Sequence, residues 1–183
     1  MTHRTLDELE AGLAALSSPA DAGRLELVVR RPAVDAREVL DAAALSTDVG
    51  LVGDTWHVRS SSRTPDGRPH PDMQLNVMNT RVADLVAGSR SRWPLAGDQL
   101  LVDLDLSEAN LPAGTRLAVG DEAIIEVTAL PHTGCGKFAA RFGVDALKFV
   151  NGAAHRHLRL RGLNARVVRG GVIRAGDAVA RME

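Results

Sequence analysis

Cys135, the only cysteine of the chain, lies in the stretch PHTGCGKF and has the most reactive side chain in the sequence. Gly134 and Gly136 flank it, so that a bulky group can approach the sulfur closely. The residues after it read as a helix, whose free amide groups, together with Lys137 and Arg141, favour a thiolate over a thiol. Such a thiolate is either a sulfur nucleophile or a soft ligand for a metal ion.

The same stretch allows three other interpretations. A free cysteine often packs inward as a small apolar residue, and the local sequence does not decide between this role and a reactive one. His132 and Cys135 have the spacing of two zinc ligands, and His155 and His157 form a second possible pair, although a structural zinc site usually has several cysteines. A cysteine-histidine dyad for acyl transfer is a further alternative, but no oxyanion hole is marked in the sequence.

Polar residues also occur within segments that read as strands. Asn76 lies in MQLNVMN, and Asn164 and Arg166 lie in LRGLNARVV. A half-buried arginine needs a partner, so we expect Arg166 to pair with an acid such as Asp54 or to bind an anionic ligand. The internal pair is the slightly favoured alternative.

The charges of the chain are unevenly distributed. Residues 1–134 carry 12 basic and 20 acidic side chains, whereas residues 135–183 carry 10 basic and 3 acidic ones. This basic segment favours an anionic partner. With three phenylalanines, two tryptophans, no tyrosine and no known nucleic-acid motif, nucleic acid is not the expected partner. A small phosphorylated ligand is favoured, and a solvated basic face is the alternative.

Length and composition indicate one ordinary domain. A chain of 183 residues can bury a core without disulfides, and we assign a helix to residues 1–19 and a single domain to residues 20–183. No apolar run is long enough to span a membrane, and the N-terminus does not resemble a signal peptide. Together with the lone cysteine, these features predict a cytoplasmic protein with no membrane partner.

Turn signals and alternating patterns predict a fold rich in strands. Alternation predicts strands over residues 100–106 and 122–128, and near residues 25 and 72. The dipeptide Gly-Asp occurs four times and is expected to form a turn before a strand each time. We interpret Asp98, Asp121 and Asp177 as turn residues. The same interpretation is less strongly favoured for Asp54.

The helices are expected to be few and short. Periodicity predicts them over residues 5–16, 34–45 and 80–87, with one or two more over 137–152. Three phenylalanines of the last segment are expected in the core: Phe138, Phe142 and Phe149. Residues 60–72 have no periodicity and predict a mobile loop or a lid, in which Arg63, Arg68 and His70 are placed to touch an anion.

Five segments in a fixed order resemble the MOSC domain, named for the C-terminal part of molybdenum cofactor sulfurases. They are GLVGDTW, PDMQLNVMN, AGDQLLVDLDLSEANLPAGTRLAVGDEAIIEV, HTGCGKFAARFG and GLNARVVRGGVIRAGDAV. The resemblance extends over about residues 20 to 182, and its specificity comes from the ordered set. It implies an α+β fold that is mainly β, namely a MOSC-type β-barrel with a few short peripheral helices.

The resemblance also implies a site. In this family a cysteine carries sulfur or contacts molybdenum, and the phosphorylated pterin of the molybdenum cofactor is bound nearby; the family is also associated with pyridoxal phosphate. Carried over to this chain, the cysteine is Cys135, as catalytic residue and metal ligand. The expected cofactor-binding residues are His132, Thr133, Gly134, Lys137, Arg141, Asp54, Asn76, Asn164 and Arg166.

The chain departs from the family pattern in two places. Members often have a proline shortly before the cysteine, where this chain has His132, Thr133 and Gly134. They also have more basic residues after the early Gly-Asp, where this chain has Thr55 and Trp56. The resemblance implies a stand-alone MOSC protein that binds the molybdenum cofactor, or carries sulfur as a persulfide, through its single cysteine.

Each of these roles implies a partner or an activity. A sulfur carrier would work with a cysteine desulfurase, and a cofactor-dependent oxidoreductase with a redox partner. The alternative from another class is a non-catalytic module that binds a phosphorylated ligand and uses Cys135 only for packing.

Overall fold

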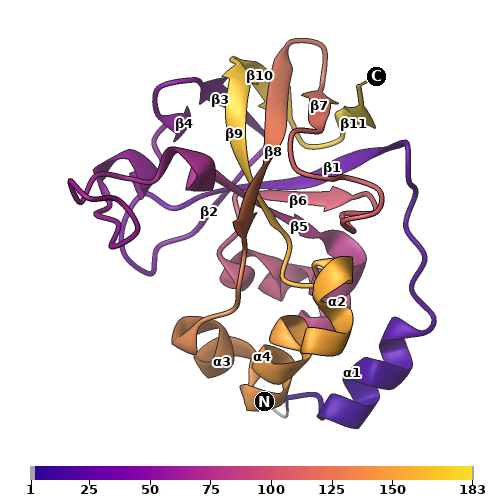
Figure 1. Ribbon diagram of the computed structural model, residues 1–183. Helices are drawn as coiled ribbons and strands as arrows, with labels where there is room; N and C mark the ends of the chain where they lie inside the picture. Colours follow the sequence, from indigo (N-terminus) through magenta and orange to yellow (C-terminus); the bar gives the residue numbers. More distant parts are fainter. Residues whose placement is uncertain (1–2, 183) are drawn as a thin grey trace.

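Seven strands close into a β-barrel in the computed structural model, which describes residues 3–182 (Figure 1). Neighbouring strands are antiparallel except β5 and β6, which are parallel, and β1 closes the ring by pairing with both β6 and β11. The short strand β2 (Glu38–Leu40) extends the sheet beyond β1. In order around the barrel, the strands are β1 (Ala22–Arg30), β6 (Leu100–Asp103), β5 (Leu75–Asn79), β9 (Leu163–Arg169), β8 (Ala123–Pro131), β7 (Arg116–Val119) and β11 (Ala178–Arg181).

The predicted alternation holds where a strand has one face in solvent. In β8, Ala123, Ile125 and Val127 are buried inside the barrel, while Glu126 on the other face is only half-buried. In β5 all five residues are buried, because the barrel interior covers one face and the helices cover the other. A half-buried strand near residue 72 was therefore the wrong prediction for β5.

A second, three-stranded sheet replaces the helix predicted over residues 34–45. It consists of β3 (Ala42–Ser46) between β4 (Gly50–Leu51) and β10 (Gly171–Arg174). The alanines favour a helix locally, but pairing with β1 and β10 and the burial of Leu45 at 3% exposure decide the structure. The helix prediction was wrong because distant strand partners outweigh local propensity.

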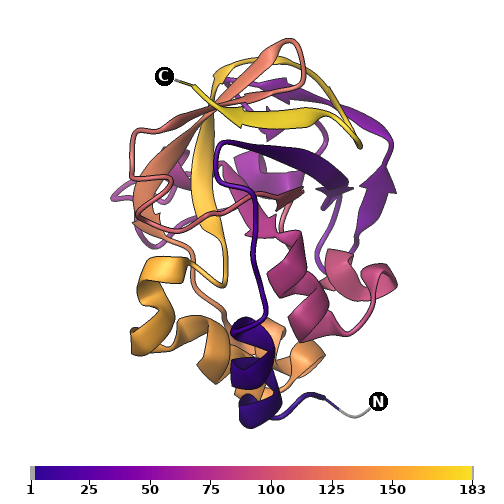
Figure 2. The ribbon, with the colours of Figure 1, turned by 90° about the vertical axis from the view of Figure 1, so that its right-hand side faces the viewer.

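The α-helices gather at one end of the barrel and enclose a second core (Figures 1 and 2). As predicted, the segment after Cys135 forms two helices, and Phe138, Phe142 and Phe149 are buried in this core. Among residues 3–182 no helix is long and apolar enough to cross a membrane. The α-helices are α1 (Leu6–Leu13), α2 (Thr80–Ala87), α3 (Gly136–Phe142) and α4 (Val144–Asn151); the 3-10 helices are η1 (Thr55–Val58), η2 (Pro71–Met73), η3 (Arg90–Ala96) and η4 (Ala153–Leu158).

The four Gly-Asp dipeptides do form turns, with positive φ at every glycine. The φ angles are 82°, 91°, 62° and 98° at Gly53, Gly97, Gly120 and Gly176. Strands β6, β8 and β11 follow the last three, as predicted, but the first is followed by η1, so that expectation of a strand was wrong.

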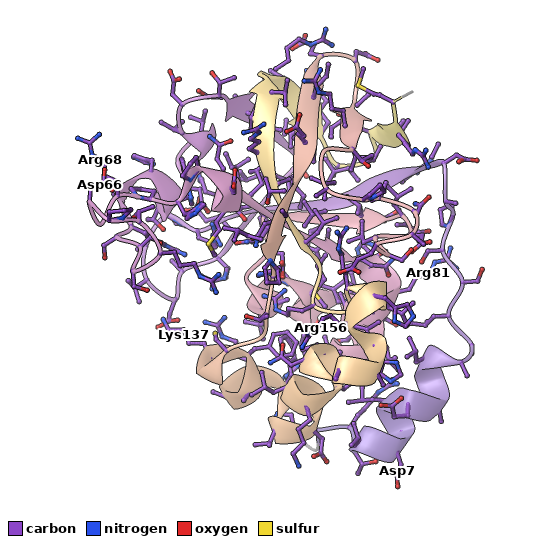
Figure 3. All side chains as sticks on the ribbon, viewed as in Figure 1. Asp7, Asp66, Arg68, Arg81, Lys137 and Arg156 are labelled. Carbon is purple, nitrogen blue, oxygen red and sulfur yellow. The ribbon has the colours of Figure 1, made fainter. Side chains whose placement is uncertain are left out.

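The segment of residues 60–72 is an irregular loop, as expected, and it ends in η2. Figure 3 shows Asp66 and Arg68 at its tip, directed away from the barrel. Its base is held to the barrel by Thr128, whose hydroxyl donates to the carbonyl of Asp72 at 2.7 Å.

Candidate functional site

Cys135 is exposed and lies directly before α3. Its backbone is extended, and its carbonyl accepts hydrogen bonds from the amides of Phe138 at 2.9 Å and Ala139 at 3.1 Å. A Cβ atom added at Gly136 would meet nothing within 4 Å, so the approach to the sulfur is open on that side. The interpretation of Cys135 as an inward-packed residue was therefore wrong.

Gly134, next to the cysteine, is held by a side chain that the sequence did not single out. Asn151, at the end of α4, accepts from the Gly134 amide at 2.8 Å and donates to its carbonyl at 3.1 Å. A Cβ at position 134 would lie 2.7 Å from Leu147 Cδ1, so that glycine is needed for this close approach. The residue before Cys135 is thus fixed to α4 through its backbone.

His132 ties the same segment to the barrel through a buried carboxylate. Its Nε2 lies 2.8 Å from Oδ1 of Asp98, which is fully buried. Arg161, also buried, donates to both carboxylate oxygens of Asp98, at 2.9 and 2.6 Å, and to the carbonyl of Ala96. We call Asp98, His132 and Arg161 the buried triad.

The protonation states of the buried triad follow from burial and charge. Burial alone would raise the pKa of Asp98, but the charge of Arg161 and the hydrogen bonds from His132 and Arg161 outweigh it and lower the pKa to about 2. Burial and the charge of Arg161 lower the pKa of His132 below its usual value, although Asp98 acts in the opposite direction. Near neutral pH, His132 is therefore neutral and the ion pair is Asp98 with Arg161.

Our interpretation of Asp98 as only a turn residue was wrong. Gly97 makes the turn, and Asp98 is the buried partner of a buried arginine. Arg161 stands between Leu160 and Gly162 in the sequence, and this apolar setting was a signal that the arginine needs an acid.

Gly97, the neighbour of Asp98, is surrounded by arginine side chains. Its carbonyl accepts a hydrogen bond from Arg31 Nη1 at 3.0 Å. A Cβ at this position would lie 3.3 Å from Arg37 Nη2 and 3.8 Å from Arg141 Nη1. With Arg59, whose charge also acts on Arg37, these side chains form what we call the arginine cluster: Arg31, Arg37, Arg59 and Arg141.

The segment that contains Cys135 is anchored next to the arginine cluster on both sides of the cysteine. Before Cys135, His132 contacts Asp98; after it, Arg141 donates to the carbonyl of Leu95 at 2.9 Å. Both anchors are on residues 95–98, next to Gly97. Residues 132–141 therefore run along the segment on which the cluster is built.

The arginine cluster carries more positive charge than its acids neutralise. Burial, followed by the charges of Arg141, Arg31 and Arg59, lowers the pKa of Arg37, and burial followed by Arg31 lowers that of Arg59. Both side chains remain charged at neutral pH, because arginine starts from a very high value. The Nε atom of Arg37 is buried and finds no acceptor within residues 3–182. An anion would relieve this repulsion.

Two aspartates contact the cluster in different ways. Asp54 is buried and forms a two-pronged ion pair with Arg31, with both distances 2.8 Å. Burial raises the pKa of Asp54, but Arg31 outweighs burial and lowers it. Asp35 is exposed, has a φ of 60°, and binds Arg141 at 2.8 Å and Lys137 at 3.1 Å.

Three of the predicted binding residues meet in one buried network. Arg31, which the sequence did not single out, bonds Asp54 on one side and the Asn76 side chain at 2.9 Å on the other. Asn76 donates to Asn164 at 2.7 Å. Arg166 lies elsewhere: it pairs with Glu126 at 2.6 Å, so the expected pairing with an acid occurs but Asp54 was the wrong partner.

A pocket of about 150 Å³ adjoins the arginine cluster beneath the loop of residues 60–72. His70 from the loop lines it, whereas Arg63 and Arg68 do not. Its walls are Arg31, Trp56, Arg59, Ser60, Ser61, Pro69, His70, Met73 and Asn76. The loop thus covers one side of the cluster, as a lid would.

The surroundings of Cys135 suit an anion better than a cation. Among residues 3–182 no three histidine, cysteine or acidic side chains gather in a way that could hold a metal ion between them. Three of the four cluster arginines come from the part of the chain that is acidic overall, so the charge bias along the sequence did not locate this site. An exposed thiol on a segment anchored next to an arginine cluster can serve an anionic group that also has a soft atom for sulfur.

Several solved structures share the fold of this chain. The YuaD protein from Bacillus subtilis has a TM-score of 0.59 and 16% identity, over 86% of this chain and 94% of that one. YiiM from Escherichia coli has a TM-score of 0.54 and 18% identity over 87% and 70% of the two chains. YiiM from Geobacillus stearothermophilus has a TM-score of 0.52 and 15% identity over 91% and 75%. These likenesses show the fold.

The sequence itself identifies the family. No curated protein matches the chain in sequence. The MOSC domain family, however, matches residues 70–180, which include β5, β8, Cys135 and β9. The chain therefore belongs to the MOSC domain family, as its ordered motifs predicted.

Proposed function

We propose that this MOSC domain binds the molybdenum cofactor, with Cys135 as the protein's sulfur ligand to the metal and the arginine cluster as the site of the pterin phosphate. The observation that carries the proposal is an exposed thiol on a segment that is anchored next to the arginine cluster. Such a pair of functions, one soft ligand and one phosphate site, matches a cofactor that has a metal at one end and a phosphate at the other.

The residues present fit such a group. Within residues 3–182, the enclosed Nε of Arg37 lacks an acceptor, and the side chain of Arg59 makes one hydrogen bond, from Nε to the Thr55 hydroxyl at 3.0 Å. Guanidinium groups with free N–H donors bind phosphate oxygens in pairs. The open side of Cys135 at Gly136 leaves room for a large ligand at the sulfur.

Each residue has a role in this proposal. Cys135 would bind the metal as a thiolate, while Asn151 and the buried triad hold the backbone just before it. Arg37 and Arg59 bind phosphate, and Arg31 keeps Asn76 and Asn164 in position. When bound, the cofactor supplies two-electron redox chemistry at molybdenum.

The proposal is tested by cofactor content. The protein is purified from a host that makes the cofactor, and molybdenum and pterin are measured per mole of protein for wild type, Cys135→Ser, Arg37→Gln and Arg63→Gln. Arg63 is an exposed arginine of the loop and does not line the pocket beside the cluster, so it serves as the charge-matched control. We expect Cys135→Ser to retain less molybdenum than wild type, and Arg37→Gln to retain less of both components. Equal content in all four proteins, including none in any, would remove the cofactor role.

A second role, as a sulfur carrier, is favoured by the exposure of Cys135. An open thiol can take the terminal sulfur of a donor persulfide, so that the donor leaves as a thiolate and Cys135 becomes the persulfide. The test is incubation with a cysteine desulfurase and sulfur-labelled cysteine. Label on wild type but not on Cys135→Ser is expected; an unlabelled wild type would remove this role.

A further inference from the structure

A second cavity, of about 320 Å³, lies on the other side of the segment that leads from β8 to α3. None of its walls belongs to the arginine cluster, and neither Cys135 nor Lys137 lines it. In Figure 3, Lys137 and Arg156 are labelled on opposite sides of this segment. The walls are Glu108, Thr128, Ala129, Leu130, Pro131, His132, Thr133, Val150, Asn151, Arg156, Arg159, Arg161, Gly162 and Leu163.

An irregularity in the barrel opens this cavity. Val127 of β8 pairs with Ala165 of β9, but the next pair is Pro131 with Leu163, so β8 has two extra residues between the pairs. Such bulges bend a strand away from its partner and are frequent next to binding sites. The extra residues include Ala129 and Leu130, which form one wall.

The walls combine an apolar floor with positive charge. Leu130, Pro131, Val150 and Leu163 supply the apolar part. The positive charge comes from Arg156 and Arg159, because the third arginine of the walls, Arg161, is neutralised by Asp98. Glu108 is the only acid among the lining residues; it forms no ion pair within residues 3–182, but its charge acts on Arg159 and opposes the lowering of the Arg159 pKa by burial.

Two arginines in this cavity have free donors. Arg156 is exposed, and its side chain makes no hydrogen bond or ion pair within residues 3–182. Arg159 is half-buried and uses only Nη1, which donates to the carbonyl of Leu111 at 2.6 Å and that of Leu106 at 3.4 Å. Its backbone has a φ of 49°, a left-handed conformation that few residues other than glycine adopt. The turn after η4 therefore holds Arg159 in place at the cavity.

We propose that this cavity is a binding site for a small organic anion, a carboxylate or phosphate on a compact apolar body. Arg156 and Arg159 bind the anionic group, and Leu130, Val150 and Leu163 contact the body. A volume of about 320 Å³ is at the small end of ligand pockets, so the ligand is a small metabolite. The cavity shares His132, Asn151 and Arg161 with the residues that hold the Cys135 segment, but its anion-binding residues, Arg156 and Arg159, have no role in the proposed cofactor site.

The test uses benzoate as the probe, with residue-resolved NMR of the ¹⁵N-labelled full chain. Benzamide has the same ring without the charge, and acetate has the charge without the ring. We expect benzoate to cause saturable shifts of the amides of Thr133 and Gly162, with far weaker effects from benzamide and acetate. Because the shifts are read at amides of residues that line the cavity, binding of benzoate at the arginine cluster can be told apart from binding in the cavity.

Two variants address the two parts of the site. Arg156→Gln removes a charge that makes no contact in the fold, and Ala129→Leu adds bulk at an exposed position on the cavity wall. Each is expected to raise the dissociation constant of benzoate at least fivefold, while Arg63→Gln leaves it unchanged. The proposal is overturned if benzoate causes no saturable shift at Thr133 and Gly162, if benzamide binds equally well, or if both variants bind benzoate like wild type.

Discussion

Replacing Asp98 with asparagine removes the negative charge at the centre of the buried triad. Asp98 is fully buried and receives two contacts from Arg161 and one from His132, all within 2.9 Å. The variant keeps the volume and one acceptor oxygen but leaves the buried Arg161 without its counter-ion. Loss of one partner of a buried ion pair costs about 3–5 kcal/mol. We expect Asp98→Asn to lower the free energy of unfolding by roughly 3 kcal/mol.

The assay is urea unfolding at pH 7, followed by circular dichroism and tryptophan fluorescence, for the variants of a double-mutant cycle. Arg161→Met removes the other charge and retains an apolar chain of similar length. Each single variant leaves one buried charge without its partner, whereas the double variant leaves no buried charge. The cost of the double variant should therefore be smaller than the sum of the two single costs by roughly 2–3 kcal/mol. A cost of less than about 1 kcal/mol for Asp98→Asn, or additive costs in the double variant, would refute this reasoning.

The same carboxylate predicts an effect of acid. The pKa of Asp98 is lowered from 3.8 to about 2 in the folded protein, so the unfolded chain takes up the proton first. The stability that this shift provides, roughly 2 kcal/mol, is present above pH 4 and is lost as the pH falls from about 4 to 2. The Asp98→Asn variant should not show this part of the loss of stability in acid.

Three further predictions concern neighbouring residues. Asn151→Ala removes both side-chain hydrogen bonds to Gly134 and should increase hydrogen exchange at that amide at least tenfold; unchanged exchange would show that α4 does not hold this segment. Gly97→Ala must place a Cβ at a φ of 91° and 3.3 Å from Arg37, and should cost about 1–2 kcal/mol by urea unfolding, whereas a neutral effect would contradict the close packing. Because the pKa of His132 is lowered on folding, the unfolded chain binds its proton first, and stability should decline as the pH falls through 6.5; His132→Gln should flatten this decline, and an unchanged pH profile would contradict the assignment.

Local patterns predicted the parts of this fold that depend on neighbours in sequence. Helices were predicted over residues 5–16, 80–87 and 137–152, and α1, α2, α3 and α4 lie there. The helix prediction for residues 34–45 was wrong because β2 and β3 form by pairing with other strands, β1 and the distant β10. The barrel and the MOSC family were predicted by the order of the motifs, and both are confirmed.

The site was predicted less completely, for a physical reason. Cys135, Asp54, Asn76 and Asn164 were singled out, but Arg31, which joins the last three, was not, because it stands between Arg30 and Pro32 in a segment without a motif. Long polar side chains reach partners that are distant in sequence, so their pairing depends on the closed barrel. The same holds for the arginine cluster, whose members come from three separate segments: residues 31–37, Arg59 and Arg141.

The most direct test of the central claim is X-ray absorption at the molybdenum edge of protein loaded with the cofactor. The proposal places one protein thiolate on the metal in addition to the sulfur atoms of the pterin. Loaded Cys135→Ser should therefore show one sulfur neighbour fewer than wild type, while Arg63→Gln should match wild type. An identical sulfur shell in wild type and Cys135→Ser would contradict the role of Cys135 as the metal ligand.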